Sequence, residues 1–413
     1  MSSSKEKYVG NLKGQSPFSR SLKRFLRNVP AVAGLVIIAI SLVLAVLGYL
    51  ITPDKTSNAN DQVLQITNKP PGFETKMLLR RKNKNIESTS FLNTMLFGKP
   101  SAYEQIPIRD FRVEAGNLIV EEYTASESYF PEKTFNIADL LFAIDTEQEV
   151  KQKGNALHYL TIEGDQASIE LDKAIAQLQS DNIALRTYRL GTDKFGRDML
   201  SRLVIGVRIS LSVGIIAVVI SLIIGIFLGC IAGYYRGRTD DFIMWFINVI
   251  WSIPTLLLVF AITLALGKGF WQIFIAVGLT MWVEVARVVR GQVMSLREIQ
   301  FVEAAQSMGY SDFRTIFIHV LPNILGPIIV IAAANFASAI LIEAGLSFLG
   351  IGVQPPVPSW GGMLNENYGY IIGKNPFLAL IPGFAIMLMV LAFNLVGNGF
   401  RDALDVKTNL GGK

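Results

Sequence analysis

The residue types that most often carry out catalysis are scarce in this chain of 413 residues. Its two histidines, His158 and His319, lie far apart, and neither belongs to the H-E-x-x-H pattern of a zinc hydrolase. Cys230 is the only cysteine and lies in an apolar run, so no disulfide can form within the chain. We therefore expect no metal site and no cofactor.

Phosphate chemistry is also not indicated. A nucleotide-binding P-loop needs a glycine five residues before its Gly-Lys pair and a Ser or Thr after it. The sequence has four Gly-Lys pairs, and none is preceded by that glycine; the residues at the required position are Asn93, Ile262, Tyr368 and Lys407. We therefore expect that the chain binds no nucleotide and is not an enzyme.

Two carboxylates, Glu284 and Glu343, fall inside long apolar runs. A charge left in lipid costs roughly 2.5–3.5 kcal/mol or more, so each is a candidate for a functional role. Glu284 lies about one turn from Arg287, toward the cytoplasmic end of its predicted span, where an ion pair or snorkelling to the membrane surface would satisfy it. We interpret both as structural, because a proton relay would need more ionisable groups along one path.

The apolar runs dominate the composition. The chain is 51% hydrophobic and 17% charged, whereas soluble chains carry about a quarter charged residues. A membrane-spanning helix needs about 20 apolar residues. Six segments meet this requirement: 29–51, 209–232, 242–266, 270–290, 324–348 and 377–399. The net charge of +5 is spread along the chain, which does not indicate nucleic-acid binding.

The distribution of Lys and Arg predicts the orientation. The tail 1–28 is rich in both, so it should be cytoplasmic, and six spans then place the C-terminal tail 408–413 on the same side. Segment 29–51 is too long for a signal peptide and should be a retained anchor. Three arginines at the outer end of the second span cut against this orientation: Arg197, Arg202 and Arg208. Nearby Asp193 and Asp198 could pair with some of them, and a helix lying in the membrane interface could hold the rest.

Residues 52–189, between the first and second spans, are more polar. "NLIVEEY" alternates as a strand does, and "SIELDKAIAQLQSDNIAL" has helical spacing of its apolar residues. The sequence therefore predicts an α-helical integral membrane protein of six transmembrane helices, with an extracytoplasmic α+β domain inserted at 52–189.

The stretch 303–322, "EAAQSMGYSDFRTIFIHVLP", interrupts the apolar runs and predicts two short amphipathic helices. The first should present one apolar face, formed by Phe301, Ala304, Ala305 and Met308. Gly309 can end this helix in the left-handed conformation, and Ser311 can cap the next one. Such a helical elbow either packs on its own membrane helices or docks into a partner, and the spacing alone leaves both possibilities open.

This stretch resembles the EAA loop of ABC-importer permeases. Three further stretches resemble the C-type permease of the peptide-transport branch: "LKRFLRNVPAVAGLVII" at 22–38, "LGTDKFGRDMLSRLVIGVRISLSVG" at 190–214 and "EAGLSFLGIGVQPPVPSWGGML" at 343–364. The resemblance covers 20–52 and 190–407. Segment 53–189 departs from the pattern, because relatives have a much shorter connection there.

The resemblance implies that 190–407 is a permease core with five transmembrane helices, forming half of a pore for peptides across the cytoplasmic membrane. It further implies two cytoplasmic ABC ATPase subunits, a second homologous permease and an extracytoplasmic solute-binding protein as partners. In the coupling to the ATPases, Glu303 would supply a helix-end charge, Ala304 and Ala305 would allow close approach, and Gly309 would form the turn.

Other functions remain open at this stage. Related permeases carry nickel or other small solutes, and a membrane-anchored sensor or scaffold could use the 52–189 domain to bind a ligand. An ion-coupled carrier is disfavoured by the sparse intramembrane charges. The motif at 190–202 and the loop 352–362 with Trp360 lie near the predicted pore mouth, where either a structural tie or contact with solute is possible.

Overall fold

The computed structural model describes residues 17–86, 88–124, 130–267, 269–373 and 375–404. The chain forms two compact units. The first, here called the helical unit, comprises Met1–Leu42, Ser210–Gln354 and Phe384–Lys413. The second, here called the sheet unit, comprises Val43–Ile209 and Pro355–Gly383.

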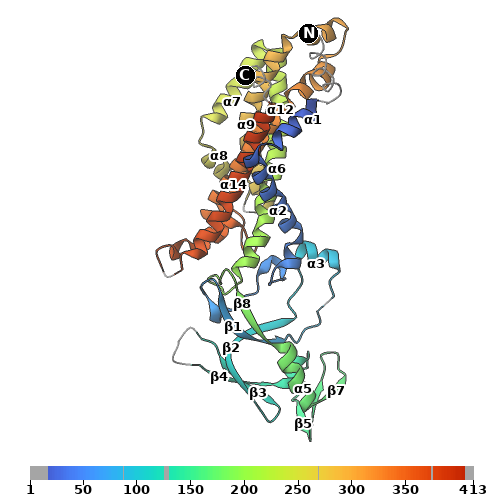
Figure 1. Ribbon diagram of the computed structural model, residues 1–413, viewed down its shortest axis with the longest axis vertical. Coiled ribbons are helices and arrows are strands. Elements are labelled where there is room, and N and C mark those ends of the chain that lie inside the picture. The colour runs from blue at the N-terminus through green and yellow to red at the C-terminus, as the bar shows by residue number, and fades with distance from the viewer. Residues whose placement is uncertain (1–16, 87, 125–129, 268, 374, 405–413) are drawn as a thin grey trace, which may run out of the picture. The chain divides into compact units, whose positions relative to one another are not determined.

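Within the described residues, five helical segments are long and apolar enough to cross a membrane (Figure 1). They are α2 Val29–Ile51, α6 Met199–Tyr235, α9 Phe270–Arg297, the run Asp312–Phe348 that ends in α12 Leu325–Phe348, and α14 Phe377–Leu404. The short helix α1, Pro17–Phe25, precedes α2. These five overlap five of the six predicted spans, although α6, α9, α14 and the run Asp312–Phe348 all extend beyond the predicted bounds.

The third predicted span, 242–266, is not one continuous helix. It is divided into α7, Gly237–Trp251, and α8, Thr255–Leu266, which meet at 89° (Figure 1). The break has a local cause, because Pro254 has no backbone N–H to donate and disfavours a helical conformation at Ile253. The count is six spans only if this bent pair is taken as one.

Helix α6 begins at Met199, well before the predicted start at 209. Its 37 residues correspond to about 55 Å, whereas the hydrocarbon core of a bilayer is about 30 Å thick. The apolar run therefore marks only part of the helix. The first turns contain Arg202 and Arg208, whose side chains contact other protein groups.

Helices α6 and α9 pack closely through small residues. Gly225, Gly229 and Gly233 recur every four residues on α6, and a Cβ atom at any of them would lie within 2.5–2.8 Å of α9 atoms. At Gly229 these atoms are the carbonyl oxygen of Ala286 and the Cβ of Val289. Such small residues allow two helix backbones to approach closely in a membrane.

Residues 52–189 contain the strands and helices expected of an α+β domain. Five antiparallel strands form a sheet in the order β4-β3-β2-β1-β8. Their bounds are β1 Phe73–Arg81, β2 Tyr103–Glu114, β3 Asn117–Glu122, β4 Glu132–Asn136 and β8 Ile183–Tyr188. A second sheet has the order β5-β6-β7: Lys151–Lys153, Ala156–Leu160 and Gln166–Glu170.

Three short helices accompany the sheets: α3 Phe91–Phe97, α4 Ile137–Leu141 and α5 Leu171–Gln177. Helices α4 and α5 contribute to the domain core with Leu78, Leu118 and Val120 of the larger sheet. The predicted strand at "NLIVEEY" is β3, in which alternate residues are buried. The predicted helix over 168–185 is shorter than expected, because Ile169 lies in β7 and Ile183 begins β8.

Candidate functional site

The first of the two predicted short helices of the elbow is present, but the second was wrong as a separate short helix, because its helical run Asp312–Phe348 continues into α12. Helix α10, Gln300–Ser307, ends before Gly309, which adopts the left-handed conformation with φ +77°. The Gly309 N–H donates to the carbonyl of Gln306 (2.9 Å). Ser311 then caps the short helix α11, Asp312–Arg314, by accepting a hydrogen bond from the Arg314 N–H. The predicted left-handed conformation of Gly309 and the predicted helix cap at Ser311 are confirmed.

The predicted apolar face of α10 was wrong in its composition. Val302 and Ala305 point into the protein and are buried, whereas Phe301, Ala304 and Met308 are exposed. The small side chain of Ala305 therefore serves packing within the chain. Glu303, Ala304 and Gly309 are accessible, and their roles in coupling stay predictions.

The inward side of the elbow packs on α6 and α9. Val302, Ile316 and Val320 lie in one buried cluster with Val289 and Val293 of α9. On its other side the second limb exposes Phe313, of which 69% is accessible. The elbow thus packs on its own membrane helices with one set of apolar side chains and leaves another set free.

Tyr234, near the end of α6, connects both limbs of the elbow. Its hydroxyl donates to Asp312 Oδ1 (2.9 Å) and accepts from Gln306 Nε2 (2.9 Å). The guanidinium of Arg297, at the end of α9, lies 5.3 Å from the centre of its ring. Sequence reasoning missed Tyr234, because no local spacing relates it to residues some 70 positions later.

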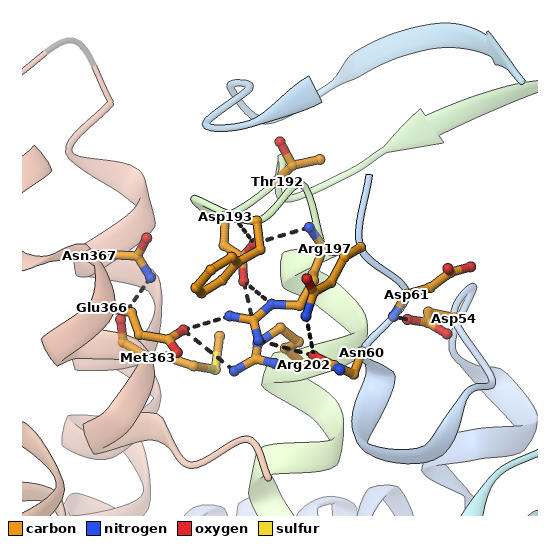
Figure 2. A network of polar contacts seen from close by, with 12 residues as sticks. Asp54, Asn60, Asp61, Thr192, Asp193, Arg197, Arg202, Met363, Glu366 and Asn367 are labelled. Atoms are coloured by element: carbon orange, nitrogen blue, oxygen red, sulfur yellow. Dashed lines mark hydrogen bonds and ion pairs between the residues drawn. The ribbon is translucent and has the colours of Figure 1, made fainter. Parts of the chain in front are cut away.

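A second set of polar contacts, in the sheet unit, accounts for two of the crowded arginines (Figure 2). Arg197 pairs with Asp193 (2.6 Å) and Glu366 (2.8 Å), and Arg202 lies 3.6 Å and 3.5 Å from the same carboxylates. Arg197 also donates to Asn60 (3.2 Å). The arginine and Asp193 side chains are almost fully buried, so two anions balance two cations away from solvent.

Asp198 does not pair with an arginine, contrary to one of the expected possibilities. Its carboxylate caps the start of α6 by accepting from the Ser201 N–H (2.8 Å), and burial raises its pKa. The two Nη atoms of Arg208 donate to backbone carbonyls of Val46, Met95 and Leu96, whereas its buried Nε has no hydrogen-bond partner among the described residues. The arginines at this end of α6 are therefore held by protein groups.

Trp360, the first residue of helix α13 (Trp360–Asn367), is also structural. It is buried, and its indole N–H donates to the carbonyl of Leu203 (3.0 Å). This contact ties α13 to α6. The geometry therefore supports a structural role for Trp360.

The two intramembrane carboxylates, Glu284 and Glu343, differ in burial and in their contacts. Glu343 is buried and accepts from the Ser347 hydroxyl (2.7 Å), as a structural role requires. Of the two expected ways to satisfy Glu284, the ion pair with Arg287 does not form among the described residues, and snorkelling stays a prediction. The Arg287 guanidinium lies 3.6 Å from the centre of the Trp251 ring and donates to the side-chain oxygen of Asn248 (2.6 Å).

Comparison with known proteins identifies the family. The model of the binding-protein-dependent transport system inner membrane component matches residues 225–409, and that of the N-terminal transmembrane domain of oligopeptide transport permease C matches 16–71. The glutathione transport permease GsiD of Pectobacterium atrosepticum is 43% identical over 218 residues, which are 53% of this chain and 72% of that protein. This chain belongs to the binding-protein-dependent transport permeases.

Two further relatives place the permease in the C-type branch. The dipeptide permease DppC of Alkalihalophilus pseudofirmus is 46% identical over 217 residues, 52% of this chain and 71% of that protein. The oligopeptide permease OppC of Bacillus subtilis is 39% identical over 230 residues, 56% of this chain and 75% of that protein. The elbow lies within the larger family match.

The permease is longer than these relatives. The residues aligned with GsiD are 72% of that protein but 53% of this chain, and those aligned with DppC are 71% of that protein but 52% of this chain. Neither family model covers residues 72–224. Most of the strand-containing domain lies in this interval. The two family models therefore leave the strands of this chain unmatched.

Proposed function

We propose that the chain is the C-type permease subunit of an ATP-driven peptide importer in the cytoplasmic membrane. It would form half of the pore with a second homologous permease, receive force from two ATPase subunits and accept solute from an extracytoplasmic binding protein. The named substrates of its relatives are glutathione, dipeptides and oligopeptides, which share peptide chemistry.

The observation that carries this proposal is the two-sided elbow. One side is fixed to α6 by Tyr234 and packs on α9 through Val302 and Ile316, while Phe313 and Met308 are free on the surface. An ATPase subunit that gripped the free side and moved would shift α6 and α9 together, because their glycine contacts leave no space between them.

Each accessible residue of the elbow that the sequence singled out has a role in the proposed coupling to the ATPase. Glu303 is the acidic residue in the first turn of α10, where the helix dipole favours negative charge. Ala304 presents a small exposed side chain that would let a partner approach the backbone closely. Gly309 provides the left-handed turn that sets the angle between the limbs.

The proposal fixes the orientation of the chain. The elbow and both termini would be cytoplasmic, and residues 52–189 would form an extracytoplasmic domain facing the binding protein. Single cysteines at the exposed positions Glu149 and Ala304, in a Cys230→Ala background, can be probed with a membrane-impermeant thiol reagent. Labelling at 149 but not at 304 in intact cells is expected.

The docking role is tested by placing a charge on the free side of the elbow. Phe313→Asp should reduce recovery of the ATPase subunits with the purified permease by about tenfold, because a desolvated carboxylate opposes an apolar contact. Leu185→Asp is a matched control, since Leu185 of β8 is 67% exposed and lies outside the elbow. Equal ATPase recovery with both variants would contradict the proposed function.

A further inference from the structure

A pocket in the helical unit lies at the break between α7 and α8. It has a volume of about 230 Å³, and the lining residues come from the break itself, from α9 and from α12. Its polar side chains are Thr255, Thr280, Glu284 and Ser338. This pocket is separate from the elbow and from the arginine contacts of the sheet unit.

Glu284 is the only charged residue among those lining the pocket. It lies at the middle of α9, and every 20-residue window of this 28-residue helix contains it, so it falls within the membrane wherever the bilayer is placed. Within the part of the chain that the structure describes, Glu284 has no ion-pair partner. An exposed carboxylate at this depth is costly unless it meets a cation or water.

The neighbouring cation is already engaged. Arg287 is held over Trp251 and by Asn248, and among the described residues it forms no ion pair with Glu284. The arginine therefore fixes the end of α7 at the pocket wall. The carboxylate remains available to a group that enters from outside the chain.

The broken backbone also indicates a binding site. Irregular backbone at membrane depth is tolerated where it lines a cavity, and transporters bind solutes at such breaks. Helix α7 ends at Trp251 and helix α8 begins at Thr255, both on the pocket wall, so the opposite partial charges of the two helix ends offset one another. The carboxylate of Glu284 therefore decides the preference, which is for a positively charged group.

We propose that this pocket binds the cationic ammonium group of the solute as it passes through the membrane, with Glu284 as the counter-ion. The inference rests on the proposed function, in which the ammonium is the N-terminus of a peptide. The exposed hydroxyls of Thr255 and Ser338 are further acceptors for its hydrogens.

The test uses the complete importer in proteoliposomes, with radiolabelled short peptides and the same peptides after N-acetylation. Glu284→Gln should lower uptake of the free-amine peptides about tenfold and leave the slow uptake of the acetylated peptides unchanged. Glu284→Asp should restore most of the loss. Glu163→Gln, the same change at an exposed loop position of the 52–189 domain, should leave uptake as in the wild type.

Three results would overturn the inference while leaving the proposed function in place. They are wild-type uptake by Glu284→Gln, an equal loss for free and acetylated peptides, and loss of the partner permease from the purified variant. Failure of the wild-type importer to take up either peptide set would contradict the proposed function itself, and this inference with it.

An independent observation concerns helix α3 in the sheet unit. Its four largest apolar side chains are accessible: Phe91 (67%), Leu92 (63%), Leu96 (48%) and Phe97 (65%). None of its seven residues is buried. A helix of this length has no reason to expose so much apolar surface to water.

Arg208 fixes the depth of α3 along the spanning helices. Its guanidinium donates to the carbonyls of Met95 (2.8 Å) and Leu96 in α3 and of Val46 in α2 (3.1 Å). Val46 lies five residues before the end of α2, which is about 7–8 Å along the helix. The C-terminal end of α3 is therefore level with the outermost turns of a membrane span.

We infer that α3 lies in the membrane interface, with its phenylalanines in the lipid. Val46 and Ile51 of α2 are also exposed, so the apolar surface of α3 continues the lipid-facing surface of that span. Interfacial helices of this kind insert their apolar side about 5–10 Å into the boundary between headgroups and acyl chains.

Spin labels on α3 distinguish lipid from water and from a protein contact. A label at Leu92→Cys, in a Cys230→Ala background of the reconstituted importer, should be accessible to oxygen and protected from a polar nickel reagent. A label at Glu163→Cys, an exposed loop position of the 52–189 domain, should show the reverse. Accessibility of position 92 to the nickel reagent, or to neither reagent as in a protein contact, would contradict the inference.

Discussion

At the scale of single residues, the account depends on side chains that join distant parts of the chain. Tyr234 is the clearest case, because one hydroxyl contacts both limbs of the elbow. A typical hydrogen bond contributes about 0.5–1.5 kcal/mol net, so losing both would loosen the connection without unfolding the protein.

The first prediction is therefore that Tyr234→Phe separates ATP hydrolysis from transport. The ATPase subunits should still bind, since Phe313 and Met308 are unchanged, but the uptake per ATP hydrolysed should fall severalfold. Tyr103→Phe, in β2 of the sheet unit, is the control. An unchanged ratio of uptake to hydrolysis in Tyr234→Phe would remove Tyr234 from the coupling.

At the scale of elements, the packing of α6 on α9 transmits any movement of the elbow. A second prediction follows from Gly229, where a Cβ would lie 2.6 Å from the Ala286 carbonyl oxygen. Gly229→Ala should separate the two helices and lower the thermal unfolding temperature in detergent. Gly291→Ala on α9, where a Cβ meets no atom within 4 Å, should not lower it. Equal unfolding temperatures would show that the contact is not tight.

The local features of these elements could be predicted from the sequence because their causes are local. Gly309 ends a helix by its own conformational freedom, and Ser311 caps the next by a bond within three residues. The alternation of β3 reports burial on one face of a sheet. In each case the deciding interaction joins residues that are only a few positions apart in the sequence.

The remaining features depend on contacts between distant residues. Glu284 and Arg287 are one turn apart, but Trp251 and Asn248 of another helix hold the arginine. The start of α6 was missed because its arginines are neutralised by Asp193 and by Glu366 of another segment. The break at Pro254 was hidden by the uniformly apolar residues on both sides.

At the scale of the whole molecule, the inserted domain can be removed along a natural boundary. Phe73 of β1 pairs with Tyr188 of β8, so the two strand ends lie side by side and a short turn can replace residues 74–187. This deletion keeps Asn60 and therefore the contacts of Arg197, but it removes α3 and with it the Met95 and Leu96 carbonyls that hold Arg208.

The third prediction is that the deleted permease inserts and assembles with its partners but loses uptake driven by the binding protein. Membrane fractionation, co-purification and uptake measure these three properties. Normal uptake would show that the domain is accessory to transport.

The central claim is that the elbow converts movement of the ATPases into movement of the spans. Gly309 tests it most directly, because its left-handed conformation sets the angle of the elbow while no neighbouring atom would meet an added Cβ. A side chain in this conformation costs roughly 1–2 kcal/mol, and a β-branched one fits worse. The strain from a substitution is thus confined to the turn.

The decisive measurement is peptide uptake together with ATPase recovery for Gly309→Val and Gly309→Asn, expressed with the partner subunits. The account predicts that the valine variant reaches the membrane and assembles with the second permease, but loses ATPase docking or transport-linked hydrolysis. The asparagine variant should be milder, because Asn adopts the left-handed conformation more readily. Wild-type uptake and ATPase recovery by the valine variant would contradict the account.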